Sequence, residues 1–395
     1  MTVLATQSAV PEPDRTQRRL LLALGAAVFM VNLDARVVAP LLPTLAAELQ
    51  VSLARAAWLV SAYSLPYGLC QLMFGPLADR YGKVTVCAHA MAAFSIGTAC
   101  TSLWPSFGAI LTLRVLTGAA AAGLIPLTLA YIGDTVPYER RQATIATLMA
   151  SAGAAQALST SLGGSIATFL SWRAVFPCVG ALACLATLGV YVFGRQARKA
   201  PQLTAQRPAY RAVLLTPGLR PLLALVCIEG CLMFGGFSYL SGLLEERFGL
   251  SALGIGFVLS LAGLSQLVTA RLLPRLLRRW PERRLLGCGG AAMAFGYLAS
   301  AAAPHWWVVA LGCASLGMGF ILCHTTLQTR ATEAVPHARG TAVALFAFSL
   351  FMGSGLGTAG LGVLLERVGF GMLFTLQGLL LVLFTLVVVR VLGRS

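Results

Sequence analysis

The feature that most constrains this chain is a series of long apolar runs, each about the length of a membrane-spanning helix, separated by short connections. Of the 395 residues, 58% are hydrophobic and 11% are charged, and the mean hydropathy is +0.81. Soluble domains carry roughly a quarter charged residues, whereas a helix crosses the bilayer core with about 20 apolar residues. The runs therefore predict an all-α membrane protein that leaves no stretch for a soluble domain.

The number and spacing of the runs predict twelve transmembrane helices in two pseudo-symmetric six-helix bundles. The N-terminal bundle is expected over residues 1–194, a central cytoplasmic loop over 195–220 and the C-terminal bundle over 221–395. The predicted spans, in chain order, are Leu20–Leu42, Ala56–Leu77, Val84–Leu103, Ser106–Ile132, Gln142–Thr168, Ala174–Gly194, Pro221–Leu244, Ala252–Ala270, Leu285–Ala303, Trp306–Thr329, Thr341–Leu365 and Phe370–Val389.

The basic residues predict the orientation. With the N-terminus inside, 23 of the 29 Lys and Arg residues fall on the cytoplasmic side, 4 outside and 2 within spans, as the positive-inside rule requires. The net charge of +16 is thus spread over short connections and not over one polar face, so we expect no nucleic-acid partner. The first run is too long for a signal peptide. We expect a multi-pass protein of a bacterial cytoplasmic (inner) membrane with both termini in the cytoplasm.

The two halves of the chain repeat at an offset of 199 residues, at which Gly118 also matches Gly317. Convergent loop chemistry is the alternative to duplication. In transporters, such a repeat implies two parallel halves with a site between them at mid-depth. The loops after the fourth and tenth predicted spans share an acid, a proline, an arginine and an alanine in register: Asp134, Pro137, Arg140 and Ala143 in the first, and Glu333, Pro336, Arg339 and Ala342 in the second.

A charged, glycine-containing connection lies between the second and third predicted spans. It reads Gly75-Pro-Leu-Ala-Asp79-Arg80-Tyr-Gly82-Lys83, and it closely resembles the loop signature of the major facilitator superfamily. The glycines permit a tight turn. In that family the loop latches the two halves on the cytoplasmic face, so the resemblance implies that Asp79 and Arg80 are gate residues. An ordinary charged turn is the alternative.

The resemblance covers nearly the whole chain. The tenth-span stretch Gly317–Arg330 looks like the twelve-span drug:proton antiporter group, whose cargoes include drugs, sugars and nucleosides. In the fifth span, the antiporter motif G-P-x-x-G-G is replaced by Ser159-Thr-Ser-Leu-Gly163-Gly164. The glycine pair still permits close helix approach, but the proline bend is absent. The second copy of the charged loop, around Arg271 to Arg275, lacks the acid.

Two opposite charges lie inside the first and fourth predicted spans. Asp34 and Arg114 are each eight residues from the outer end of their span, or about 12 Å deep, so they can be level. A charge at mid-bilayer costs roughly 2.5 to 3.5 kcal/mol. We predict that Asp34 pairs with Arg114 when ionised and loses that pairing when protonated, which switches the substrate-binding state. A fixed ion pair that holds the helices together is the alternative.

Further ionisable groups occur on related spans. Arg36 shares the first span, Glu229 lies in the seventh and His324 in the tenth. In the superfamily fold, helices one, four, seven and ten line the central cavity. Glu229 is therefore a second candidate proton carrier, or else a neutral buried acid with a hydrogen-bond partner. His324 is expected to be a polar group of the cavity wall more than a proton relay.

Uncharged polar residues within the spans are candidate substrate contacts, although packing explains each one better than substrate contact does. The ten cysteines are scattered and show no metal-ligand or redox spacing, so we expect no metal or cofactor. The expected coupling ion is H⁺. The candidate contacts are Asn32, Gln71, Gln156, Gln266 and Gln328.

Taken together, these features predict a secondary active transporter that exports small amphipathic molecules in exchange for protons by alternating access, as a monomer in the lipid bilayer. The alternative is a proton symporter or facilitator that imports a sugar or an organic acid. A membrane enzyme needs a paired nucleophile and base or a metal cluster, and the sequence offers neither within its spans. A channel is expected to show repeated pore loops or subunit symmetry.

Overall fold

The computed structural model describes residues 15–195 and 210–392, and every regular element in these ranges is a helix. The two termini and most of the predicted central loop lie outside the described residues. Eight described segments are long and apolar enough to cross a membrane. One of them, Arg339–Leu392, folds back at Gly369 into two helices, and three further long helices carry more polar residues. These segments give the twelve helices predicted from the sequence.

The first bundle is built from the N-terminal half of the chain. Serines begin several of its helices, because the Ser52, Ser106 and Ser171 hydroxyls accept hydrogen bonds from backbone N–H groups of the first turn. The elements are α1 (Arg15–Val37), η1 (Ala39–Leu41), α2 (Leu42–Glu48), α3 (Leu53–Tyr81), α4 (Lys83–Cys100), α5 (Phe107–Ala121), α6 (Leu124–Thr135), α7 (Tyr138–Phe169) and α8 (Trp172–Phe193).

The second bundle follows a short helix, α10. The turn within its last element depends on Gly369, whose φ of 71° lies in the left-handed region that favours glycine. The elements are α10 (Tyr210–Leu214), α11 (Leu219–Phe237), α12 (Leu240–Phe248), α13 (Ala252–Leu277), α14 (Glu282–Ala301), α15 (Trp306–Glu333), η2 (Pro336–Ala338) and α16 (Arg339–Leu392).

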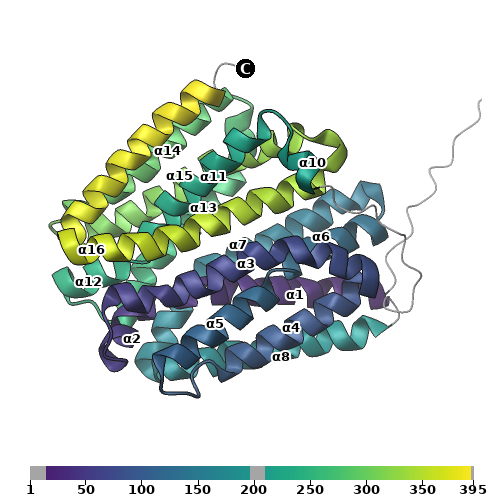
Figure 1. Cartoon of the computed structure of the whole chain (residues 1–395), viewed down its shortest axis with the longest axis horizontal. Coiled ribbons are helices and arrows are strands. Elements are labelled where there is room, and N and C mark those ends of the chain that lie inside the picture. The colour runs from purple at the N-terminus through teal and green to yellow at the C-terminus, as the bar shows by residue number, and fades with distance from the viewer. Residues whose placement is uncertain (1–14, 196–209, 393–395) are drawn as a thin grey trace, which may run out of the picture.

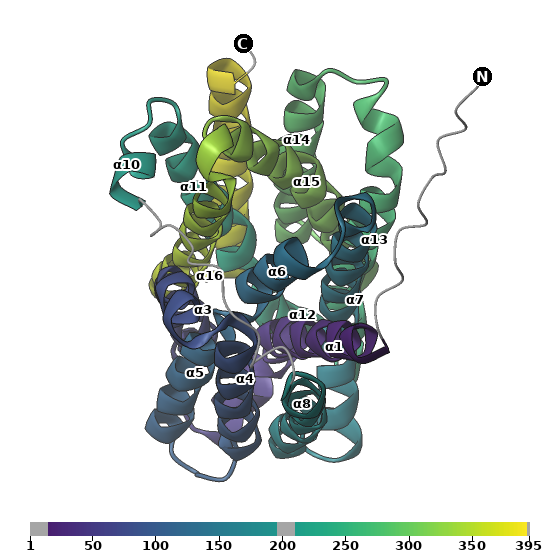
Figure 2. The ribbon, with the colours of Figure 1, turned by 90° about the vertical axis from the view of Figure 1, so that its right-hand side faces the viewer.

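The two bundles pack against each other, and the long helices of both run between the same two ends of the molecule (Figure 1). We call the end that carries the Gly75–Lys83 loop and α10 the motif end, and the end that carries α2, α12 and the turn at Gly369 the far end. Figure 1 shows the far end on the left. Figure 2 looks onto the motif end, where α3 runs beside α16 and α7 runs beside α13.

Small residues bring the two bundles together over the half of the interface nearer the far end. The Ser61 hydroxyl donates to the Gly355 carbonyl across a distance of 2.8 Å, and the Leu253 N–H donates to the Thr168 hydroxyl at 3.1 Å. Gly164 of α7 faces Gly256 of α13, so close that a Cβ on Gly164 would lie 3.2 Å from the Gly256 Cα. The far end is therefore closed in this conformation.

Candidate functional site

Asp34 and Arg114, which the sequence predicts to pair, form an ion pair in the structure. The Arg114 Nη1 atom of α5 lies 2.7 Å from the Asp34 Oδ2 atom of α1, and the exposed fractions of the two side chains are 1% and 0%. The pair is thus fully withdrawn from water and lipid. Each charge of such a buried pair is compensated by its partner. Removal of either side chain leaves the other charge uncompensated and is expected to lower the free energy of unfolding by about 3–5 kcal/mol.

Two neighbouring groups contribute to the surroundings of this ion pair. The Tyr63 ring of α3 lies under the Arg114 guanidinium, whose carbon is 4.3 Å from the ring centre. The Ser159 hydroxyl of α7 donates to the Leu33 carbonyl at 2.5 Å and fixes α1 against α7. Among the described residues, however, no group donates to the second Asp34 oxygen, Oδ1. That oxygen is a buried acceptor position that a proton or a water molecule can satisfy.

A second buried acid is paired in the other bundle. The Glu229 Oε2 atom of α11 lies 2.9 Å from His324 Nδ1 of α15, and Glu229 is 0% exposed. The imidazole stacks on Phe320 with 4.4 Å between ring centres and also contacts Phe346. The second Glu229 oxygen, like that of Asp34, has no partner within the described ranges. His324 therefore positions Glu229 directly. The sequence predicts His324 only as a polar group of the cavity wall and does not predict this contact.

Arg36 has a different environment from Arg114. Its guanidinium carbon lies 3.8 Å from the ring centre of Phe234, a residue of α11 in the opposite bundle. Asp34 and Arg36 are two positions apart, so at 3.6 residues per turn they point to nearly opposite sides of α1. One charge thus faces into the first bundle and the other faces the interface between bundles.

Arg36 lines a narrow cavity between the two bundles, with a volume of about 20 Å³. That space accommodates roughly one water molecule. Gln156 and Gln266 also line it, from α7 and α13, and Gln156 Nε2 lies 3.4 Å from the Asn32 side-chain oxygen. Three of the predicted substrate contacts therefore lie at or next to this cavity. Its other walls include Thr160, Met233, Phe234, Phe237 and Leu259.

The remaining predicted contacts lie elsewhere. Gln71 is buried in α3 with its side-chain oxygen unpaired among the described residues. Gln328 is half-buried in the last third of α15, near the motif end. Neither lines the cavity between the bundles. Sequence alone does not distinguish these glutamines, because the face that a helix turns toward the interface is set by packing.

The charged loop at the motif end has its turn at Gly82, whose φ of 92° requires glycine. Asp79 and Arg80 are exposed, and the Arg80 guanidinium lies 5.1 Å from the ring centre of Tyr81. Lys83, the last residue of the motif, forms an ion pair with Asp134 at the end of α6. In this conformation the loop therefore ties α4 to α6 within one bundle.

The short helix α10 contacts the start of the same motif. The Tyr210 hydroxyl donates to the Leu72 carbonyl at 3.0 Å, and a Cβ on Gly75 would lie 3.7 Å from that hydroxyl oxygen. Partial burial, and secondarily the negative charge of Asp79, raise the pKa of Tyr210. The hydroxyl is therefore protonated and available as a donor at neutral pH.

The structure shows a counterpart of the Lys83 ion pair in the second bundle that sequence analysis missed. Arg330 of α15 binds Glu282 at the start of α14, with 2.5 Å between Nη2 and Oε2. Glu282 lies 199 residues after Lys83, the offset of the repeat. Its partner is not in register, because Arg330 corresponds to Tyr131 and Asp134 corresponds to Glu333, so the repeat alone does not predict this pair. The other repeat residues, Arg140, Glu333 and Arg339, lie at the motif end.

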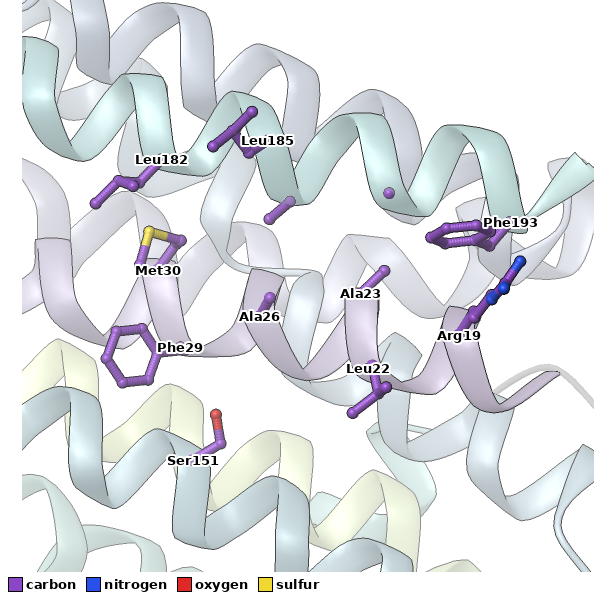
Figure 3. Close-up of a pocket in the computed structure, with 12 residues that line it drawn as sticks. Arg19, Leu22, Ala23, Ala26, Phe29, Met30, Ser151, Leu182, Leu185 and Phe193 are labelled. Carbon is purple, nitrogen blue, oxygen red and sulfur yellow. The ribbon is translucent and has the colours of Figure 1, made fainter. Parts of the chain in front are cut away.

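A groove of about 590 Å³ lies away from this charged centre. It runs between α1, α7 and α8 on the outer side of the first bundle, with Arg19 and Phe193 at one end and Phe29 and Met30 at the other (Figure 3). Its leucines are mostly exposed. In a helical membrane protein such an apolar surface faces lipid tails, so we do not assign it to the central site.

A sequence model of the Major Facilitator Superfamily matches residues 24–358. The uncharacterized MFS-type transporter YceJ of Bacillus subtilis is 27% identical over 347 residues, which cover 86% of this chain and 87% of YceJ. A chloramphenicol resistance protein of Pseudomonas aeruginosa is 25% identical over 73% of this chain and 70% of its own length. Several other relatives are matched over only 26% to 39% of their length.

Solved structures show the same fold. A crystal structure of a D-xylose–proton symporter superimposes with a TM-score of 0.76 at 16% identity, and the match covers 93% of this chain and 96% of that one. The two-bundle architecture, the charged loop and the family match over most of the chain agree. The protein is therefore a transporter of the Major Facilitator Superfamily and not an enzyme.

Proposed function

We propose that this transporter exports small amphipathic molecules in exchange for protons, by alternating access between its two bundles. The observation that carries the proposal is the buried Asp34–Arg114 pair, in which one carboxylate oxygen is neutralised and the other has no partner within the described ranges. A proton that binds this carboxyl removes the negative charge that Arg114 requires. Protonation therefore changes the free energy of the contact between α1 and α5.

The position of the pair supports a coupling role. Asp34 lies in the same helix as Arg36, which reaches the opposite bundle at Phe234. A movement of α1 that follows protonation is thus transmitted to the interface between the bundles. Because that interface is closed at the far end, we propose that this conformation opens toward the motif end. The positive-inside count predicts that the motif end faces the cytoplasm.

The direction of transport is proposed to be outward. The family relative named as a chloramphenicol resistance protein favours export over the import alternative. Glu229 is the second candidate for a proton-binding group, because His324 contacts one of its oxygens and no described residue contacts the other. The two acids occupy different bundles, so each is a separate point at which protonation can act.

The test uses inverted membrane vesicles that contain the full-length protein. Cells that express it are first screened for growth against chloramphenicol and puromycin, with and without a proton uncoupler. Vesicles given an acid interior should then accumulate the compound that the cells resist, and the uncoupler should abolish accumulation. Uptake of that compound into intact cells instead of loss from them would favour the importer.

The coupling residue is tested with Asp34→Asn, which retains the size of the side chain and a contact with Arg114 but cannot ionise. We expect loss of proton-driven accumulation, with exchange of substrate between the two faces retained. The control is Glu246→Gln, which removes the charge of an exposed acid in α12 at the far end. Proton-driven accumulation that survives in Asp34→Asn contradicts the proposed role.

A further inference from the structure

Arg36 supplies the central site with a positive charge that no acid in the described residues neutralises. Arg114 pairs with Asp34, and Glu229 pairs with His324. Arg36, in the part of the chain that the structure describes, forms neither an ion pair nor a hydrogen bond, and its guanidinium lies over the face of the Phe234 ring. The contact between a cation and a ring leaves the charge without a negatively charged partner.

The surroundings of Arg36 have a polar side and an apolar side. Gln156, Thr160 and Gln266 face the cavity from α7 and α13, which meet at the interface between the bundles. Thr160 is 3% exposed, and its hydroxyl oxygen has no hydrogen-bond partner among the described residues. A buried hydroxyl without a partner is unfavourable, so it marks a position where a ligand or a water molecule is accommodated.

The opposite wall consists of the apolar side chains Met233, Phe234 and Phe237 of α11. The Phe234 ring also packs edge-on against Phe320, with 4.9 Å between ring centres. These aromatic side chains belong to one bundle, whereas Arg36 and Thr160 belong to the other. When the bundles separate at the motif end, a ligand that enters between them therefore meets the guanidinium, Gln156 and Thr160 on one bundle, and the ring faces together with Gln266 on the other.

We propose that Arg36 binds the negatively charged group of an amphipathic organic anion, whose apolar body contacts the aromatic wall. The guanidinium is planar and pairs with the two oxygens of a carboxylate or sulfonate, and it remains charged at every physiological pH. Thr160 and the two glutamines donate hydrogen bonds to the same group. This assignment of a substrate class rests on the proposed function as a transporter.

The proposal is tested by equilibrium binding to the purified full-length protein in lipid nanodiscs. The probes are naphthalene-2-sulfonate, which is anionic, and naphthalene-2-sulfonamide, which has nearly the same shape and is neutral at pH 7. Wild-type protein should bind the sulfonate more tightly. The Arg36→Gln variant should lose about tenfold or more in sulfonate affinity, as expected for a buried charge-assisted contact, while its affinity for the sulfonamide changes little. Arg36→Lys should show an intermediate loss.

Retention of sulfonamide binding shows that each variant is folded, and Arg55→Gln, an exposed position at the far end, controls for a general loss of positive charge. Equal loss of both probes in Arg36→Gln, unchanged sulfonate binding, or no sulfonate binding by the wild type overturns the proposal. Failure here leaves Asp34-dependent transport of neutral compounds intact. Conversely, Arg36-dependent binding without proton-driven transport in vesicles contradicts the proposed function but supports the anion site.

Discussion

The contact between Gly164 and α13 offers a direct test of alternating access. A Cβ on Gly164 would lie 2.2 Å from the Ala252 carbonyl oxygen, which belongs to the backbone of the opposite bundle. Ordinary contacts between non-bonded heavy atoms are about 3.5 Å or longer. The backbone of α13 must therefore move away by roughly 1 Å before Gly164→Ala can be accommodated.

The size of the effect follows from the cost of overpacking. An extra methyl group in a well-packed contact costs about 1–3 kcal/mol, and each 1.4 kcal/mol changes an equilibrium about tenfold. Because the clash exists only when the far end is closed, the penalty applies to that state alone. We expect Gly164→Ala to reduce the closed population by about five- to 150-fold and to slow transport correspondingly.

The assay is hydrogen–deuterium exchange on the full-length protein, together with transport in vesicles. Peptides from the far-end halves of α7 and α13 should exchange faster in Gly164→Ala than in the wild type. The matched control is Gly360→Ala in α16, because a Cβ at that position meets nothing within 4 Å. The control also corrects for the higher helix propensity of alanine, which is worth about 1 kcal/mol over glycine.

The reasoning is refuted by a Gly164→Ala protein that matches Gly360→Ala in both exchange and transport. Such a result would mean that the close contact of α7 with α13 is not part of the working cycle. Gly256→Ala is the reciprocal change, because its Cβ would lie 2.4 Å from the Thr160 carbonyl oxygen. The two variants should therefore behave alike.

Three further predictions concern other parts of the structure. Glu229→Gln retains an acceptor for His324 but cannot ionise, so the pH profile of transport should shift while the protein remains folded; an unchanged profile excludes Glu229 as a proton carrier. Lys83→Asp should lower the melting temperature by a few degrees, and adding Asp134→Lys should restore it, because the reversed pair repeats the charge order of the second bundle; no recovery contradicts a pairing role. Gly82→Ala places a side chain at positive φ and should cost about 1–2 kcal/mol, measured by thermal unfolding in detergent, and a neutral result would mean that the turn relaxes.

The sequence by itself determined the class of fold and the charged centre of the first bundle. Apolar runs of membrane-spanning length allow only helices, since each backbone polar group must be satisfied within its own segment. The rise per residue in a helix is fixed, so residue counts placed Asp34 and Arg114 at the same depth. Their high cost in lipid then predicts that they pair, which the distance of 2.7 Å shows.

Only the tertiary structure decided which side chains meet around that centre. Arg36 reaches Phe234 of the other bundle, the buried Thr160 hydroxyl has no partner in the described part of the chain, and Glu282 pairs with Arg330. These contacts depend on how far each helix is rotated about its axis and on how closely small residues let the bundles approach. Rotation and approach are set by packing between segments distant in the chain, which residue counts along a single helix do not contain.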